Sequence, residues 1–164
     1  MVTALRAQPL TRAAFAAFGE VIATDGAASY PINGGRAQRY HALATVDGTR
    51  AEGQPVISIF RTAPVTLPYP VVVLERHRLG SQAFMPLHDR PFVVVVAPNG
   101  ADDCPGEPQA FLTDGRQGVN FRAGTWHAPL LALHAQCDFL VVDRAGPAVD
   151  CDEVRLSAPP LLRL

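Results

Sequence analysis

The chain has 164 residues, a length typical of one domain, and 48% of them are hydrophobic while 18% are charged. Fourteen basic residues face fifteen acidic ones, and no block of like charge indicates a nucleic-acid-binding surface. No apolar run approaches the roughly 20 residues of a transmembrane helix, and the N-terminus does not resemble a secretory signal. We therefore expect one domain over residues 1–164, located in the cytoplasm, without a nucleic-acid or membrane partner.

A short helix is predicted near the start of the chain. Thr11 is a suitable N-cap for the alanine-rich stretch that follows, in which Phe15 and Phe18 would share one face. Gly19 could then end the helix in a left-handed conformation.

The rest of the chain predicts short strands separated by glycine and proline turns. Seven β-rich runs occupy residues 56–60, 71–79, 81–87, 92–97, 109–113, 118–121 and 137–144. The spacings leave no room for crossover helices, so we expect an all-β sandwich or barrel rather than a parallel α/β sheet. After Arg144 the periodicity is lost, and we expect this tail to wrap around the barrel or a partner.

The three cysteines, Cys104, Cys137 and Cys151, are odd in number and show no CxxC spacing. This argues against a disulfide framework and against a cysteine zinc site. Ordinary thiols are the simpler interpretation.

Residues 80–127 resemble the two sequence motifs of the cupin superfamily. Gly80 is followed by "PLH" at 86–88, a valine-rich run, "PNG" at 98–100 and finally "GTWH" at 124–127. The superfamily's first motif normally offers two histidines and a glutamate, and its second offers one histidine. Pro86 and Phe92 stand at two of these positions, which leaves His88 and His127. The resemblance implies a cupin-type double-stranded β-barrel.

Two imidazoles alone are a weak metal site, because catalytic metal sites generally keep three protein ligands. We therefore predict no firmly bound metal, with His88 and His127 as ligands if one is bound. His127 lies between the only tryptophan and Pro129, at a turn expected to face the barrel cavity, so it is a candidate functional imidazole.

Over nearly its whole length the chain resembles the ureidoglycolate lyase family of the cupin superfamily. The resemblance runs through "PLTRAAFAAFGEVI" at 9–22, "INGGRAQRYH" at 32–41, "LERHRLGSQAFMPL" at 74–87, "GRQGVNFRAGTWHAPL" at 115–130 and "DFLVVDR" at 138–144. It implies a homodimeric enzyme that converts (S)-ureidoglycolate into glyoxylate and urea during allantoin breakdown. The family is also associated with nickel, so a divalent ion is one option implied by the resemblance.

Such an elimination needs a cation to hold the substrate carboxylate, a base for the hydroxyl proton and an acid for the leaving nitrogen. Arginine suits the first task because its planar fork matches a carboxylate. The candidates are Arg39, Arg61, Arg76 and Arg144, with Arg61 preferred because it ends an apolar strand.

The run 71–79 presents two alternative faces, because side chains alternate along a strand. If the face of Val73, Glu75 and His77 points inward, Glu75 and His77 can share protons and Arg76 turns outward. We prefer this arrangement, with His127 or the Glu75–His77 pair as the base. The alternative is a surface strand on which both side chains only solvate the sheet.

Five further side chains are candidates for binding the substrate. Gln82 and Asn120 can offer amides, Trp126 lies next to His127, Asp143 could orient a histidine, and Arg39 could reach across a dimer interface. For each, a structural or surface role is the alternative. Three rival functions also stay open: a metal-dependent cupin oxygenase or isomerase, a non-catalytic binding barrel, and a hydrolase that releases ammonia.

Overall fold

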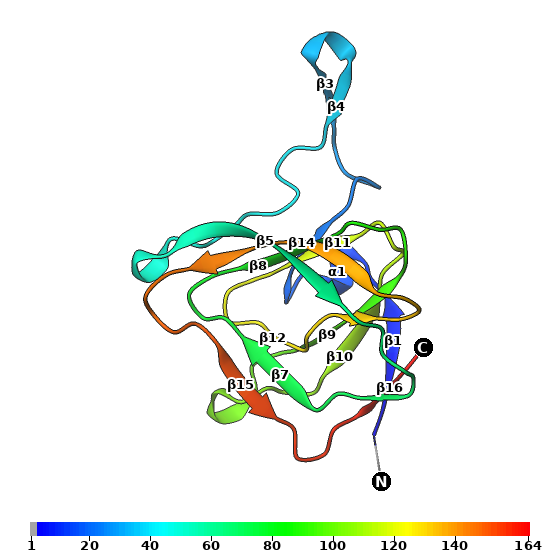
Figure 1. Cartoon of the computed structure of the whole chain (residues 1–164), viewed down its shortest axis with the longest axis vertical. Coiled ribbons are helices and arrows are strands. Elements are labelled where there is room, and N and C mark those ends of the chain that lie inside the picture. Colours follow the sequence, from blue (N-terminus) through cyan, green and yellow to red (C-terminus); the bar gives the residue numbers. More distant parts are fainter. Residues whose placement is uncertain (1–2) are drawn as a thin grey trace.

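Two β-sheets pack face to face in residues 3–164, the part of the chain that this computed structural model describes (Figure 1). The larger sheet has nine strands in the order β15-β7-β12-β9-β10-β1-β16-β6, with β13 paired to β9. Their bounds are β1 (Ala4–Pro9), β6 (Tyr69–Pro70), β7 (Val73–Arg76), β9 (Phe92–Ala97), β10 (Gln109–Leu112), β12 (Trp126–His127), β13 (Leu131–Ala132), β15 (Asp152–Arg155) and β16 (Leu161–Arg163).

The smaller sheet has five strands in the order β2-β11-β8-β14-β5. Their bounds are β2 (Gly19–Ile22), β5 (Gln54–Thr62), β8 (Gln82–Pro86), β11 (Gly118–Phe121) and β14 (Cys137–Ala145). Phenylalanines from both sheets and from helix α1 (Arg12–Phe15) fill the space between the layers. The predicted all-β fold, built from short strands in a sandwich or barrel, is confirmed.

Strand β9 is the central element because all six of its side chains are buried. Its alternate residues belong to two separate hydrophobic clusters. In the first cluster, Phe92, Val94 and Val96 face the space between the sheets. Val93, Val95 and Ala97 pack on the opposite face, against the C-terminal strand and residues 126–133. An uninterrupted valine run is therefore expected here, since a strand buried on both faces has no position for a polar side chain.

The predicted runs at 92–97 and 118–121 match strands β9 and β11 residue for residue. The single long strand predicted at 71–79 is wrong, since β7 ends at Arg76 and residues 71–72 precede it. The tail after Arg144, predicted to wrap around the barrel or a partner, joins the larger sheet. Strand β15 pairs with β7, and β16 lies between β1 and β6.

The N-terminal helix is a single turn whose first NH groups are capped by Thr11, as predicted. Gly19 does not end it. Instead, Gly19 begins β2, opposite Phe121, where its backbone passes so close to β11 that a Cβ atom would lie 1.9 Å from the carbonyl oxygen of Asn120. Within residues 3–164, no helix is long and apolar enough to span a membrane.

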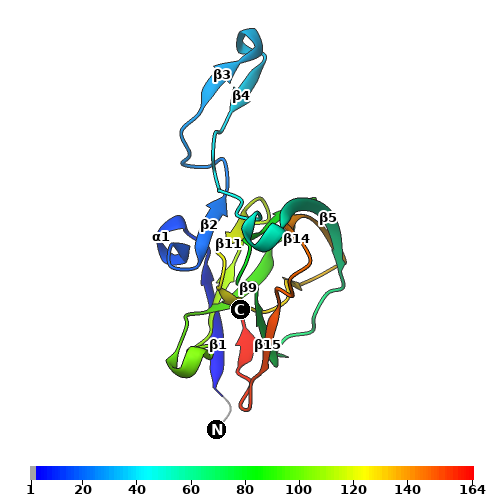
Figure 2. The same ribbon diagram turned by 90° about the vertical axis from the view of Figure 1, so that its left-hand side faces the viewer.

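A hairpin projects from this body between β2 and β5 (Figures 1 and 2). It consists of β3 (Tyr30–Ile32), a 3-10 turn at Asn33–Gly35 and β4 (Ala37–Arg39). The two strands form a separate two-stranded sheet. We call residues 27–46 the arm.

Replacement of Gly19 by alanine should cost about 3 kcal/mol of unfolding free energy, because the new methyl group would force β2 away from β11. Gly124→Ala is the matched control, since Gly124 also has a positive φ but no atom within 4 Å of its added Cβ. It should cost only about 1 kcal/mol. Urea unfolding of both variants measures the difference, and equal losses would show that the close approach of β2 to β11 is not a constraint.

Candidate active site

Glu75, His77 and His127 meet inside the barrel, on the inward face of β7 and on β12. His127 lies directly opposite Glu75 in the antiparallel pairing of these strands, so their side chains leave the sheet side by side. The Nε2 atom of His127 lies 3.4 Å from Oε1 of Glu75, and the two imidazole rings are 5.5 Å apart between centroids. One potential ligand atom from each residue lies within 4.8 Å of the others.

Main-chain carbonyls orient both imidazoles. His77 Nδ1 lies 2.6 Å from the carbonyl oxygen of Asp150, and His127 Nδ1 lies 2.9 Å from that of Thr125. A carbonyl oxygen can only accept a hydrogen bond, so each ring carries its proton on Nδ1 when neutral. The Nε2 atoms of both rings are buried and have no hydrogen-bond partner within residues 3–164.

Within the described part of the chain, the centre of the site therefore consists of hydrogen-bond acceptors only. Two imidazole lone pairs and a carboxylate face one another, and such an arrangement is stable only when a proton or a metal cation lies between them. The pKa of Glu75 is lowered, first by its close side-chain contact with His127, while partial burial of the carboxyl opposes this shift. Electrostatic attraction to both imidazoles lowers the pKa further.

Two pockets open on either side of this cluster. The smaller, of about 110 Å³, is largely apolar; it is lined by Phe60, Thr62, Glu75, Phe84 and His127 together with residues 128–130. The larger, of about 370 Å³, has polar and apolar surface in about equal parts; its wall includes the polar side chains of His77, Ser81, Gln82, Asp143 and Asp150, together with residues 144–146, Ala148 and Cys151. We call the larger one the polar pocket. The ring of Phe121 stacks on His127 at 4.3 Å and fixes its plane.

Gln82 brings a buried side-chain amide to the wall of the polar pocket, with 5% of its surface exposed. Its Nε2 atom donates to Oδ2 of Asp143 across 3.4 Å, which sets the orientation of the amide. The Oε1 atom is left buried without a partner among the described residues. Gln82 Oε1 is therefore a hydrogen-bond acceptor that is free to bind a donor from a ligand in the pocket.

Comparison with known proteins decides the family. The sequence profile described as ureidoglycolate lyase matches residues 2–162. Proteins named ureidoglycolate lyase from Burkholderia mallei and Pseudomonas paraeruginosa are 53% and 52% identical to this chain. The alignments cover 93% and 91% of the chain, and 89% and 88% of those proteins.

The chain belongs to the ureidoglycolate lyase family. The family predicted from the sequence is confirmed, and so is an enzyme of the lyase type; the rival functions are not favoured. Among solved structures, the dTDP-6-deoxy-D-glucose-3,5-epimerase of Legionella pneumophila is a distant match. It is 16% identical, with a TM-score of 0.44, over 78% of this chain and 72% of that one.

In this member of the ureidoglycolate lyase family, β7 presents Glu75 to the cavity, and His77 just beyond its end meets the same cluster. The preferred inward face of the 71–79 run is thus the one observed. Gln82 and Asp143 also line the cavity, although main-chain carbonyls rather than Asp143 orient the histidines. The catalytic and binding roles of these residues stay predictions.

The expectation that Arg76 turns outward holds only in part, because Arg76 is 3% exposed on the opposite face of β7. Its guanidinium forms ion pairs with Asp103 and Asp152 and lies 4.3 Å from the centre of the Trp126 ring. The prediction that Trp126 binds substrate is not supported, because it points away from His127 into this second cluster.

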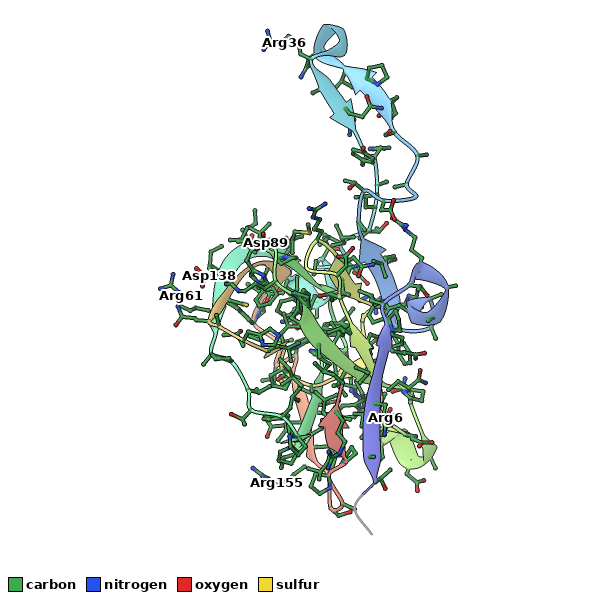
Figure 3. The ribbon with its side chains drawn as sticks, turned by 90° about the vertical axis from the view of Figure 1, so that its right-hand side faces the viewer. Arg6, Arg36, Arg61, Asp89, Asp138 and Arg155 are labelled. Carbon is green, nitrogen blue, oxygen red and sulfur yellow. The ribbon has the colours of Figure 1, made fainter. Side chains whose placement is uncertain are left out.

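The structure does not bring Arg61 to the cavity either. Side chains alternate along β5, and since Phe60 and Thr62 line the apolar pocket, Arg61 points outward. There it forms a two-pronged ion pair with Asp138 on the surface (Figure 3). The preferred carboxylate clamp of the sequence interpretation is therefore wrong for a site built from one chain.

Asn120 and Arg39 also lie outside the cavity of their own chain. Asn120 is 1% exposed and donates to Oε2 of Glu20 and the carbonyl oxygen of Thr45, so it fastens the root of the arm to β11. Arg39 is exposed on β4, within the arm.

The proposed metal pair of His88 and His127 is wrong. His88 lies in a turn after β8, where Nδ1 accepts from the NH of Arg90 and the ring packs against Phe139 and Phe92. A row of core rings, Phe139, Phe84 and Phe121, connects His88 to His127. The imidazole that joins His127 is His77 instead.

Sequence reasoning missed Thr62, Phe84, Phe121 and Asp150 as parts of the site. The first three follow from the two-residue period of their strands once the inward face is known. Asp150 contributes its carbonyl oxygen from the tail, which has no periodic signal. The three cysteines are free thiols, as expected.

Glu75→Gln should alter how stability depends on pH. The folded pKa of Glu75 is lowered, so its contribution to stability is complete above the ordinary value of 4.5 and is lost as the pH falls through the folded pKa. The unfolding free energy of the wild type should therefore fall more steeply in acid than that of Glu75→Gln. Urea unfolding across this range, with the exposed Glu107→Gln as control, measures the difference. If the unfolding free energies of all three proteins fell in parallel with pH, the lowered pKa of Glu75 would be contradicted.

Proposed function

We propose that this site cleaves (S)-ureidoglycolate to glyoxylate and urea. The supporting observation is the convergence of Glu75, His77 and His127, in a family whose relatives carry the name ureidoglycolate lyase. The substrate bears a carboxylate, a hydroxyl and a ureido nitrogen on one carbon. Its cleavage moves one proton from the hydroxyl and delivers one to the nitrogen, with no change in oxidation state.

A cluster of acceptors that holds one proton can perform both transfers. His127 Nε2, backed by the carboxylate of Glu75, accepts the hydroxyl proton as the C=O bond of glyoxylate forms. The electrons of the C–N bond pass to the leaving nitrogen. His77, protonated on Nε2, donates the proton that completes urea. The carbonyls that hold both Nδ1 atoms keep the reactive nitrogens aimed at the same space.

The same three residues fit a divalent cation, which we propose as an alternative occupant of the cluster. Two neutral imidazoles and a carboxylate form a ligand set that leaves open positions for substrate. His77 and His127 would bind it through their unpartnered Nε2 atoms, and Glu75 would bind it through its carboxylate. When bound, the ion would polarise the oxygens of the substrate.

The polar pocket is suited to the ureido end of the substrate. A terminal ureido group has NH donors, and Gln82 Oε1 and the carboxylate of Asp143 are acceptors at the wall of the pocket. We propose that these two acceptors fix the orientation of the substrate, with the reacting carbon beside the cluster. The homodimer, the cytoplasmic location and the role in allantoin breakdown also remain proposals, supported by the family resemblance.

The direct test follows glyoxylate, urea and ammonia from racemic ureidoglycolate, with and without prior chelator treatment. Equal amounts of glyoxylate and urea from one enantiomer are expected. His127→Gln should turn over roughly 10² to 10⁴ times more slowly, because it removes the acceptor that takes the hydroxyl proton. Its melting temperature should change little, since glutamine can occupy much of the same volume.

Ammonia as the nitrogen product would contradict the lyase. Activity that survives chelation would assign the proton transfers to side chains. Loss of activity, with recovery on adding a divalent ion, would assign the cluster to metal. Full activity of His127→Gln would remove this residue from the mechanism.

Gln82→Met should lower kcat/KM roughly tenfold by removing one hydrogen-bond acceptor while keeping the shape of the side chain. Inhibition by urea should weaken to a similar extent, whereas inhibition by glyoxylate should not change. Steady-state kinetics with each product as inhibitor separates the two. Weaker inhibition by glyoxylate alone would place the opposite end of the substrate at Gln82.

A further inference from the structure

The cavity lacks an available arginine to hold the carboxylate of its proposed substrate. All fourteen basic residues of the chain are arginines. Among the described side chains that line the two pockets, Arg144 is the one arginine. Its guanidinium is already bound to the main-chain carbonyls of Arg50, Ala51 and Ala148. The site of one chain is therefore incomplete for an anionic substrate.

The arm carries the available arginine side chains that the cavity lacks. Residues 27–46 include Arg36, Arg39 and His41 but no aspartate or glutamate. The polar pocket, in contrast, contains the carboxyl groups of Asp143 and Asp150, and Asp143 forms no ion pair within residues 3–164. The two surfaces have complementary charge.

One face of the arm has the composition of a binding surface. Tyr30 lies opposite Arg39 and Ile32 lies opposite Ala37, so the side chains of these four residues share one side of the hairpin. The strands β3 and β4 pair only with each other among the described residues. An isolated two-stranded hairpin is marginally stable in water, so a surface to pack against would stabilise this arm.

The root of the arm lies at the rim of the polar pocket. Ser81, in the wall of this pocket, exchanges hydrogen bonds with Asp47 at the end of the arm: its NH donates to the Asp47 carbonyl, and its Oγ accepts from the Asp47 NH. Beyond the root, Ile57 and Ile59 on edge strand β5 are 73% and 53% exposed. An edge strand with such an apolar face normally has a cover.

We propose that two copies of this chain exchange arms, and that each arm closes the polar pocket of the other copy and brings Arg39 to it. A two-fold axis beside the rim makes the exchange reciprocal, because each arm leaves the body next to its own pocket. Arg39 of one copy holds the substrate carboxylate in the other. The role given to Arg39 rests on the proposed function, whereas the exchange of arms does not.

Figure 3 shows why the other arginine of the arm is a suitable control. Arg36 lies at the tip of the arm, the part farthest from the body, and outside the paired strands. It does not belong to the face shared by Tyr30 and Arg39. Arg36→Ala should therefore keep wild-type turnover, while Arg39→Ala should lose most of it.

A mixed dimer distinguishes an exchanged arm from one that serves its own chain. Arg39→Ala and His127→Gln, each nearly inactive alone, are co-expressed with different tags, and dimers that carry both tags are purified. Exchange predicts about half of wild-type activity, since one cavity is intact and receives an intact arm from the other chain. No recovery, with both variants folded and dimeric, would overturn the proposal.

Cross-linking tests the exchange without turnover. Cys151 lines the polar pocket, so Arg39→Cys, in a background of Cys104→Ser, should form a covalent dimer with a short thiol cross-linker. The dimer should disappear when Cys151→Ser is added. A dimer that does not depend on Cys151, or none at all, would overturn the exchange. Cross-linking of this variant, together with no cleavage of ureidoglycolate by the wild-type protein, would contradict only the proposed function.

Discussion

The arrangement of the site depends on one cross-strand pair. His127 lies opposite Glu75 because β12 pairs with β7 in this register, and a shift of one residue would turn both side chains to the other face. Main-chain carbonyls then hold the Nδ1 atoms of the two imidazoles, so that each ring keeps its Nε2 lone pair for the cluster with the carboxylate. Three acceptors held in this way attract a cation, whether a proton or a metal ion. The same arrangement makes the cluster able to accept and to release a proton.

The opposite face of β7 supports this geometry. Arg76 forms ion pairs with Asp103 and Asp152 under the ring of Trp126, so residues distant in sequence are tied to the strand that carries Glu75. Alternation along one strand thus separates reactive side chains from those that hold the strand in place. On the cavity side, the stack of Phe121 on His127 performs a similar supporting role.

Much of the fold could be predicted from the sequence because its signals are local. The valine run of β9 and the alternation of Glu75 and His77 depend only on neighbouring residues. The pairing of His127 with Glu75 depends on contacts between distant strands, so no local signal favours His77 over His88 as the companion of His127. Arg61 was misjudged for another reason: Ile57 and Ile59 on the same strand are apolar yet exposed, so hydrophobicity does not mark the inner face of β5.

The strands of the tail after Arg144 could not be predicted for the same reason, because they depend on contacts with distant strands. Strands β15 and β16 are short and carry little periodicity, and they exist because β7 and β1 offer edges to pair with. The arm is the converse case, a hairpin whose two strands pair only with each other within residues 3–164. Its sequence is similar to that of the family, but its position relative to the cavity follows only from the three-dimensional structure.

The central claim is that both Nε2 lone pairs face Glu75. Nitrogen-15 NMR of the imidazoles in chelator-treated protein tests it most directly, at a pH above the titration of both rings. The account predicts that His77 and His127 carry their protons on Nδ1, with Nε2 unprotonated. Protons on Nε2 of both rings would contradict it, because the cluster would then hold its own donors and would need no cation.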